Sequence, residues 1–536
     1  MAEVFRYEVI PSSSWAYLST ILMVSIFFKF NRLISIRNVD IILLALLSPG
    51  LLMVQHGEQQ RRTHEAEIRK LGRDLHQQNG KAITPTPGDP VNTAGPGRVA
   101  PEPPDSQEVV INSEIPLEES KEDQTKPPGS ATNGEAPGPV PQSPAAVPDR
   151  LEDRIVNVRK NIDTIVANQS WGYAWLFLVG ACLMTRMLAD PYMIRRPLLE
   201  PNLEFSGLTF LTVVLLVFLI ANVISATVTQ EDIIAAESGK DLATAKASDP
   251  AQAHANGPGY SLLFLFPVIP TFVADDETEA PASETGIQSS TSLIVVTRLM
   301  AILGQLAIVV GIYMVGFLHF NNTRMGIGIV TLYLLLPYTA EMTGRIIHIL
   351  PAAAMVWAVV CYRRPVWSGA FIGLAMGLAY YPLFLVPLWF SFYWHRGLRR
   401  FMLGFFLMVG VLVSTLIFTS ADISHFLQNV RAMFGLWAPI MEGLHGFWEG
   451  DRPDSSYRIP VIAAFFCLSL SFAAWPAQKN LGTLVSCSAA LMLAVQFWNG
   501  FGGGILMAWY LPLTLMTMFR PNLEDRTAVS LSLDEG

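Results

Sequence analysis

Three polar residues that lie between two apolar stretches have types and spacing suited to binding an anionic group. Glu341, Arg345 and His348 stand four and three residues apart, so a helical turn would place them on one side. Arginine and histidine N–H groups bind phosphate oxygens and neutralise their charge. A helix cap with a surface pair is the structural alternative. The functional interpretation is a phosphate site at Arg345 and His348, with Glu341 beside it.

Two adjacent acidic residues supply a candidate general base. Glu231 and Asp232 follow Gln230, directly after the apolar stretch 206–227. A carboxylate can take the proton from an attacking hydroxyl. We therefore expect Asp232 or Glu231 to be the catalytic base.

The segment 420–457 mixes aromatic with charged residues. This composition is typical of an interfacial belt at a membrane surface, and it would equally suit a substrate loop that stacks on a sugar or a lipid-linked head group. The candidates for this loop are His425, Arg431, Trp437, Glu442, His445, Trp448 and Asp451.

The elements that must position these residues are membrane-spanning helices. The 536 residues are 51% hydrophobic and 15% charged, with a mean hydropathy of +0.37, whereas soluble domains have about a quarter charged residues. Apolar runs of about 17–22 residues suit a hydrocarbon core of about 30 Å. The sequence therefore predicts an all-α polytopic membrane protein with about 13 transmembrane helices, near 13–29, 39–55, 170–188, 206–227, 293–318, 325–340, 346–361, 366–379, 381–394, 401–419, 458–475, 481–498 and 503–519.

Basic residues in alternate loops predict the orientation. One set of loops holds fifteen Lys and Arg residues, and the short segments of the opposite set hold five. The positive-inside rule places the richer set in the cytoplasm, so we expect the N-terminus outside and the C-terminus inside. The loops 57–169 and 228–292 are then outside, and the expected location is a bacterial inner membrane.

The loop 57–169 is predicted to contain helical arms around a disordered insert. Residues 58–78 would extend the second spanning helix, the Pro- and Gly-rich stretch 80–149 would be disordered, and helical spacing resumes after Arg150. A helical hairpin is one interpretation, and an arm that docks a protein partner is the other. The cytoplasmic linker that ends 170–205 is predicted to hold an i,i+4 ion pair between Arg186 and Asp190.

Several soluble-enzyme motifs are absent from the sequence. It has no Walker loop, no dinucleotide-binding glycine fingerprint and no His-Glu-x-x-His. We therefore expect no metal, no soluble cofactor and no nucleic-acid partner. The stretch 259–273 is too short and too proline-broken to cross a bilayer, so an interfacial or re-entrant element is expected there.

Residues 332–400 resemble the GT-C class of membrane glycosyltransferases, particularly the bacterial polyprenyl-phosphate-mannose-dependent mannosyltransferases. The matching features are a proline-ended span, a basic turn, a glycine-rich helix and a Tyr-Pro followed by Leu-x-Pro. They fall at Pro337, Arg363-Arg364-Pro365, Gly369-x-x-x-Gly373-x-x-x-Gly377, Tyr381-Pro382 and Leu385-Val386-Pro387.

The resemblance implies a seven-helix GT-C-like core over 206–419, with catalytic acids in the first outer loop, 228–292, and a second large outer loop at 420–457. Residues 1–56 and 170–205 would then be N-terminal additions, 458–519 a variable C-terminal part and 520–536 a cytoplasmic tail. The implied function is transfer of a sugar from a polyprenyl-phosphate-linked donor to an acceptor on the outer face.

Two other classes of function stay open. Ala379-Tyr380 stands where the family commonly has a lysine before Tyr-Pro, which would suit a degenerate, non-catalytic member. The first alternative is therefore a non-catalytic scaffold or subunit of a membrane complex. The second is a lipid or polysaccharide transporter.

Overall fold

A computed structural model describes residues 12–82, 146–193, 199–244, 257–271, 291–436, 441, 443–449, 453–523 and 526–527 of the chain. The described part is helical apart from one two-stranded parallel sheet, so the predicted all-α class is confirmed. The first half contains α1 (Ser12–Phe27), α2 (Ile36–Ala82), α3 (Ala146–Ala189), η1 (Asp190–Tyr192), α4 (Phe205–Ser225), α5 (Gln230–Thr244), α7 (Pro258–Thr271) and α8 (Thr291–Met314).

The second half begins with a single π-helical turn at the end of α8. The elements that follow are η3 (Val315–His319), α9 (Thr323–Leu335), α10 (Pro337–Met342), α11 (Ile346–Val360), α12 (Pro365–Leu378), η4 (Tyr381–Leu385), α13 (Val386–Tyr393), α14 (Leu398–Thr419), α15 (Ile423–Met433), β1 (His445–Gly446), η5 (Ser455–Tyr457), α16 (Arg458–Ala474), α17 (Leu481–Val495), β2 (Phe501–Gly503), η6 (Met507–Trp509) and α18 (Leu511–Phe519).

The chain divides into two compact units. Unit 1 comprises Met1–Gln60 and Thr164–Gly536, and unit 2 comprises Arg61–Asp163. Within unit 2, the end of α2 and the start of α3 are joined by an ion pair of 3.5 Å between Arg154 and Glu67. The predicted extension of the second helix is confirmed, because α2 continues to Ala82. The predicted disordered insert, 80–149, lies largely outside the described residues.

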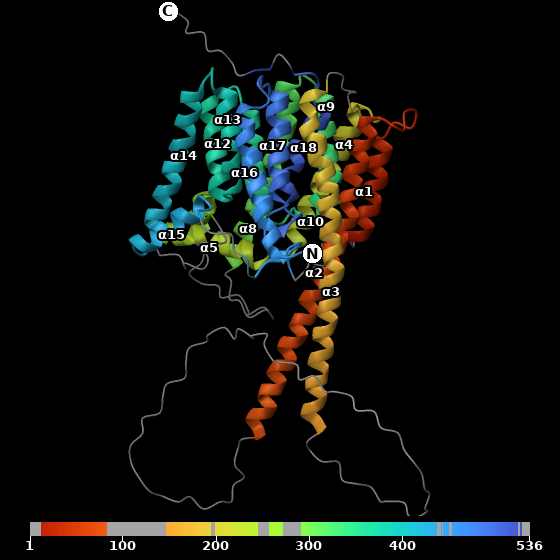
Figure 1. Cartoon of the computed structure of the whole chain (residues 1–536), viewed down its shortest axis with the longest axis vertical. Helices are drawn as coiled ribbons and strands as arrows, with labels where there is room; N and C mark the ends of the chain where they lie inside the picture. Colours follow the sequence, from red (N-terminus) through yellow and green to blue (C-terminus); the bar gives the residue numbers. More distant parts are fainter. Residues whose placement is uncertain are drawn as a thin grey trace, which may run out of the picture. The chain divides into compact units, whose positions relative to one another are not determined.

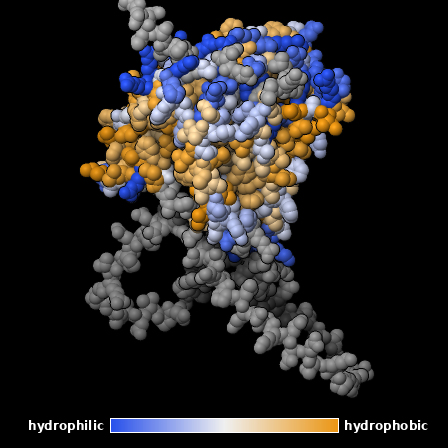
Figure 2. Space-filling model, turned by 45° about the horizontal axis from the view of Figure 1, so that its top comes forward, coloured by the Kyte–Doolittle hydropathy of each residue, from blue (hydrophilic) through white to orange (hydrophobic). Residues whose placement is uncertain are grey.

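The apolar helices identify an integral membrane protein. Among the described residues, six helices are long and apolar enough to cross a bilayer: Ile36–Gly72, Asn157–Tyr192, Phe205–Ser225, Ser292–His319, Leu398–Thr419 and Ser455–Ala474. Six shorter apolar helices of 10–17 residues accompany them. Figure 2 shows apolar side chains over much of the flank of the molecule, mixed with weakly polar ones, and most of the strongly hydrophilic side chains at one end. Such a flank suits the hydrocarbon core of a bilayer.

Several predicted spans differ from the structure because they are not single α-helices. The span 381–394 consists of η4 followed by α13. The span 325–340 is divided at Leu336, where Pro337 starts the separate helix α10, since proline has no N–H for the preceding helix. In place of a helix over 503–519 the chain forms β2, η6 and the nine-residue α18. Nine residues rise only about 14 Å as an α-helix, less than a hydrocarbon core.

Figure 1 shows how the helices of unit 1 are arranged. Helices α12, α14, α16 and α17 run in a common direction, while α5 and α15 lie across that direction at one end of them. We call this end the α5 end. Helix α4 leads into α5 and helix α14 leads into α15 at the α5 end. Helix α11 also begins there, because its first N–H, of Ile346, is hydrogen-bonded to Asp232 of α5.

Glycines allow α12 and α14 to approach closely. A Cβ atom at Gly369 would overlap the carbonyl group of Phe401, and one at Gly404 would overlap that of Val366. Further along α12, Gly377 lies against Leu412. Small residues at helix contacts let backbones pack tightly in membranes. The glycine repeat of the family resemblance therefore has a packing role in this chain.

Gly404 gives a stability prediction with a control on the same helix. We expect Gly404→Ala to lower the free energy of unfolding by about 1–3 kcal/mol, because the new methyl group forces the two helices apart. Gly410 has no atom within 4 Å of an added Cβ, so Gly410→Ala should leave stability unchanged or raise it by up to about 1 kcal/mol. Unfolding of the two variants in one detergent compares them, and equal losses would contradict the close contact.

Candidate functional site

The first turn of α5 presents the predicted acidic pair. Helix α4 ends at Ser225, and the carbonyl of Thr229 accepts the hydrogen bond from Ile233 that opens α5. The Thr229 hydroxyl donates to Oδ2 of Asp232 at 2.5 Å. A threonine followed three residues later by an acidic residue resembles a capping box. This local pattern fixes Glu231 and Asp232 in the first turn, where negative charge is favourable.

Asp232 joins α5 to the start of α11. Its Oδ1 atom accepts a hydrogen bond of 3.0 Å from the backbone N–H of Ile346, which is 114 residues away. The preceding residue, Arg345, occupies the N-cap position of α11 with an extended backbone and no cap from its own side chain. Asp232 therefore supplies the missing cap from another helix, and the exposed fraction of this residue is only 1%.

Glu231 and Arg345 form the accessible part of the site. Arg345 Nη1 lies 4.0 Å from Glu231 Oε2, and 64% of the Glu231 side chain is exposed against 25% for Arg345. Both side chains are therefore accessible to a ligand. The structure thus brings together three sequence candidates, Glu231, Asp232 and Arg345, from two helices that the spacing alone did not connect.

His348 is close in sequence but deeply buried. The exposed fraction of the residue is 2%, and its Nδ1 atom lies 2.8 Å from the hydroxyl of Tyr338. Glu341 is exposed on the last turn of α10. The predicted continuous helical turn from Glu341 to His348 is wrong, because α10 ends at Met342 and Arg345 is extended. The three side chains therefore do not project from one side.

A second arginine lies at the same end and was missed by sequence reasoning. Arg298 on α8 donates a hydrogen bond of 3.0 Å to the carbonyl of Ala226, at the end of α4. Its Nε atom is buried and has no partner among the described residues. Arg298 lies inside the predicted span 293–318. A charged residue within a span often marks a functional site, and this signal could have identified Arg298.

The described candidates on the segment 420–457 make separate contacts. His425 is buried, and its backbone N–H donates to Asp422 at 2.7 Å, while Arg431 is exposed. His445 and Glu449 form a pair of 3.9 Å. The Trp448 indole is buried and donates to the carbonyl of Phe497 at 3.1 Å. Trp437, Glu442 and Asp451 lie outside the described residues.

The burial of Trp448 contradicts, at this position, both the interfacial belt and the substrate loop that the sequence suggested. A belt tryptophan or a stacking platform needs an exposed ring, whereas this ring is 5% exposed and fixes the loop to the end of α17. The pairing of β1 with β2 holds the same segment through His445 and Phe501. The sequence signal was ambiguous because buried and interfacial tryptophans have the same side chain.

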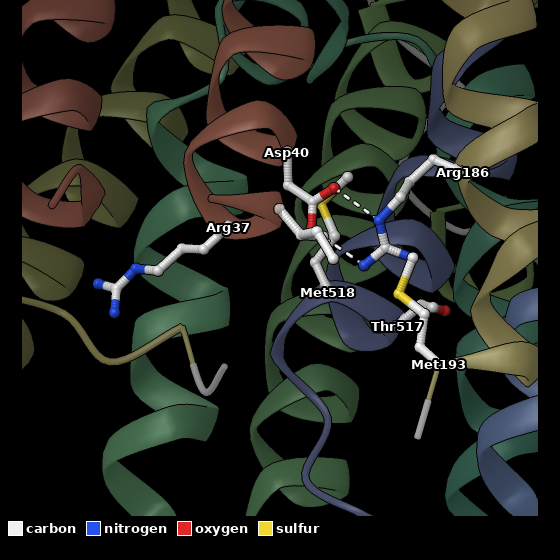
Figure 3. A pocket seen from close by; sticks show the side chains of 7 residues that line it. Arg37, Asp40, Arg186, Met193, Thr517 and Met518 are labelled. Atoms are coloured by element: carbon white, nitrogen blue, oxygen red, sulfur yellow. Dashed lines mark hydrogen bonds and ion pairs between the residues drawn. The ribbon is translucent and has the colours of Figure 1, made fainter. Parts of the chain in front are cut away.

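A buried chain of charges at the opposite end of unit 1 was only partly predicted. The expected pair of Arg186 and Asp190 is confirmed at 3.2 Å. Arg186 also binds both carboxylate oxygens of Asp40, at 2.8 and 3.1 Å (Figure 3), and Asp190 binds Arg520 at 2.5 and 3.2 Å. Asp190 is fully buried. The ion pairs connect α2 through Asp40, α3 through Arg186, and the residue after α18, which is Arg520.

Beside this chain is a small cavity of about 10 Å³, lined in part by Arg37, Asp40 and Thr517 (Figure 3). A volume of that size holds about one water molecule. Arg37 is engaged with the backbone, since it donates to the carbonyls of Phe27 and Glu200. The cavity is therefore a packing defect next to an ion network and is too small for an organic ligand.

Burial changes the acid–base behaviour of Asp232. Desolvation raises its pKa from 3.8 to about 6, against the opposing hydrogen bond from Thr229 and the charge of Arg345. Because the pKa is higher in the folded state, folding favours the protonated acid. The resulting stabilisation is complete below pH 3.8 and is lost as the pH rises through about 6.

The pH dependence of stability tests this shift. The full shift is worth about 3 kcal/mol, at about 1.4 kcal/mol for each pKa unit. Because part of it is already lost at pH 4, we expect the wild type to lose about 2.5 kcal/mol of unfolding free energy relative to Asp232→Asn between pH 4 and 7. The asparagine can keep the hydrogen bond from Ile346 but does not titrate. Chemical unfolding of both proteins across this range measures the difference. A difference that stays constant with pH would show that Asp232 titrates normally.

The geometry defines an integral membrane protein with an acidic and basic site at the ends of its helices. Among the described residues no group of three His, Cys, Asp or Glu side chains is placed to hold a metal ion. No family model, curated protein or solved structure matches this chain.

Proposed function

We propose that this protein is a membrane glycosyltransferase that moves a sugar from a polyprenyl-phosphate-linked donor to an acceptor hydroxyl at the α5 end. The observation that supports the proposal is the contact between the first turns of α5 and α11. It places the exposed carboxylate of Glu231 4.0 Å from the guanidinium of Arg345. The resemblance to the GT-C class implies acids at this position, directly after the first helix of the core.

Each exposed residue has a role in the proposed reaction. The acceptor oxygen attacks the anomeric carbon of the sugar, and the bond from that carbon to the phosphate oxygen breaks. Polyprenyl phosphate leaves with the bonding electron pair, and Arg345 stabilises its charge. Glu231 takes the proton of the acceptor hydroxyl. We assign this step to Glu231 because its side chain is exposed, whereas Asp232 is enclosed by two hydrogen-bond donors.

Asp232 and His348 are positioning residues in this proposal. Asp232 holds the N-terminus of α11 through Ile346, and so fixes the backbone that carries Arg345. His348, one turn further along α11, is held by Tyr338. Neither side chain is exposed, so neither contacts the donor phosphate directly. Each instead helps to hold the backbone that carries Arg345.

The experiment is a transfer assay with purified protein in lipid nanodiscs. Radiolabelled polyprenyl-phosphate mannose and glucose are supplied with a lipid extract as acceptor, and released polyprenyl phosphate is measured. Binding of polyprenyl phosphate is measured in parallel, because all such donors share it. Protein-dependent release and binding that weakens in Arg345→Ala are expected. Absence of both binding and release would overturn the proposal.

Unit 2 favours a non-catalytic scaffold as the second candidate. Its α2 and α3 segments carry exposed charged side chains, with 62% of Arg154 and 41% of Glu67 accessible even within their ion pair. Such a hairpin offers a polar surface for a protein partner. Purification in mild detergent distinguishes the candidates, because stoichiometric partners that depend on residues 61–163, without sugar transfer, would favour the scaffold.

A further inference from the structure

Helix α15 has an arrangement of side chains that is unusual for a helix exposed to water. Ile423 is 78% exposed and Leu427 is 49% exposed. The polar residues His425 and Asn429 are instead buried. Asn429 donates to the Ser420 hydroxyl at 3.2 Å, and His425 Nδ1 accepts from the N–H of Ala421 at 3.4 Å. Polar groups therefore face the protein while large aliphatic side chains face outward.

The surface of α15 divides into three sectors when its residues are placed at about 100° each around the axis. Buried residues form the first sector: His425, Asn429, Ala432 and Met433. Apolar residues form the second, with Phe426 and Val430 half-buried and Ile423 and Leu427 exposed. Exposed polar residues form the third: Ser424, Gln428 and Arg431. The order buried, apolar and polar around the axis suits a helix that contacts protein on one side, lipid on the next and water on the third.

The chain enters α15 from a helix whose last turn has exposed apolar side chains. Helix α15 begins four residues after the end of α14 and lies across its direction (Figure 1). The last turn of α14 exposes 59% of Ile417 and 65% of Phe418, as a spanning helix does toward acyl chains. Ile423 and Leu427 follow within ten residues of Ile417 and are exposed aliphatic side chains as well.

We propose that α15 is an interfacial helix whose Ile423 and Leu427 side chains insert into the boundary between lipid head groups and acyl chains. Arg431 follows Leu427 by one turn, at the edge of the polar sector, where it can meet lipid phosphates. Among the described residues of the segment 420–457, the aliphatic side chains of α15 thus make a membrane contact, whereas Trp448 is buried. This inference does not depend on the proposed enzymatic activity.

Spin labels on the full-length protein in phosphatidylcholine and phosphatidylglycerol vesicles test the proposal. Labels replace Ile423 and Leu427 in one set, and Ser424 and Gln428 in the matched control set, after the four native cysteines are changed to alanine. The ratio of collision rates with oxygen to those with a water-soluble nickel chelate should be at least about threefold higher at 423 and 427. Equal ratios would place α15 in water. Low access to both reagents would mean that a protein covers this sector, and would also overturn the proposal.

A second measurement avoids the cysteine-free background. Leu427→Asp places a charge in the lipid sector, and Gln428→Asp places one in the water sector. We expect the thermal midpoint in vesicles to fall for Leu427→Asp and to be unchanged for Gln428→Asp. Equal midpoints for the two variants would contradict insertion.

Discussion

Glu231→Gln is expected to reduce the rate of sugar transfer by about 10²–10⁴-fold, which is the usual contribution of a general base. Glutamine has nearly the same shape but cannot take a proton at neutral pH. Because Glu231 is largely exposed, the variant should fold with wild-type stability and should still bind polyprenyl phosphate through Arg345. Transfer rate, thermal midpoint and lipid-phosphate binding are measured on the same preparation.

Variants of Asp232 separate positioning from proton transfer. Asp232→Asn retains an oxygen acceptor for the N–H of Ile346, so it should keep most of the activity. Asp232→Ala removes the acceptor and should lose both activity and phosphate binding. If Asp232→Asn were as inactive as Glu231→Gln while polyprenyl phosphate still bound normally, Asp232 would be the base. If Glu231→Gln kept full activity, Glu231 would have no part in the chemistry.

Asp190→Asn is expected to lower the free energy of unfolding by about 3–5 kcal/mol. The carboxylate is fully buried and contacts Arg186 and Arg520. In the wild type Oδ1 accepts from Arg186 and Oδ2 from Arg520. The amide has the same shape but no charge and only one acceptor oxygen, so one of the two buried guanidinium groups loses its partner at this position. Denaturant unfolding in detergent measures the loss.

The matched control for Asp190 is Glu449→Gln, the same chemical change in a partly exposed pair with His445. A pair of this kind contributes about 0–1 kcal/mol, so the variant should unfold close to wild type. Equal effects for the two variants would mean that burial does not strengthen the Asp190 network. A loss below about 1 kcal/mol for Asp190→Asn would lead to the same conclusion.

The helices were predictable where one periodic signal continued along the chain. Mixed charges at helical spacing correctly predicted that the second helix continues past its apolar part, to Ala82. The breaks were less predictable, because Pro337 starts a new helix in this chain whereas Pro49 lies inside α2 without ending it. Packing against neighbouring helices decides whether a proline ends a helix or lies within it. A local sequence pattern does not contain information about that packing.

The site was predictable in its residue types and less so in their roles. Topology suggested that the acids after α4 and the basic residues before α11 face the same side, and Glu231 and Arg345 do meet. The sequence could not show that Asp232 is buried while its neighbour is exposed. It also showed only the i,i+4 part of the charge network, because Asp40 and Arg520 are remote in sequence from Arg186 and Asp190.

The link between Asp190 and Arg520 spans 330 residues, which has a consequence for biosynthesis. At about 5–20 residues per second, the ribosome needs about 20–60 s to reach Arg520 after Asp190 has been made. During that time α2 and α3 are already synthesised, and Asp190 carries a charge whose later partner does not yet exist. A nascent chain stopped before residue 520 should therefore be an incompletely assembled substrate for membrane quality-control proteases.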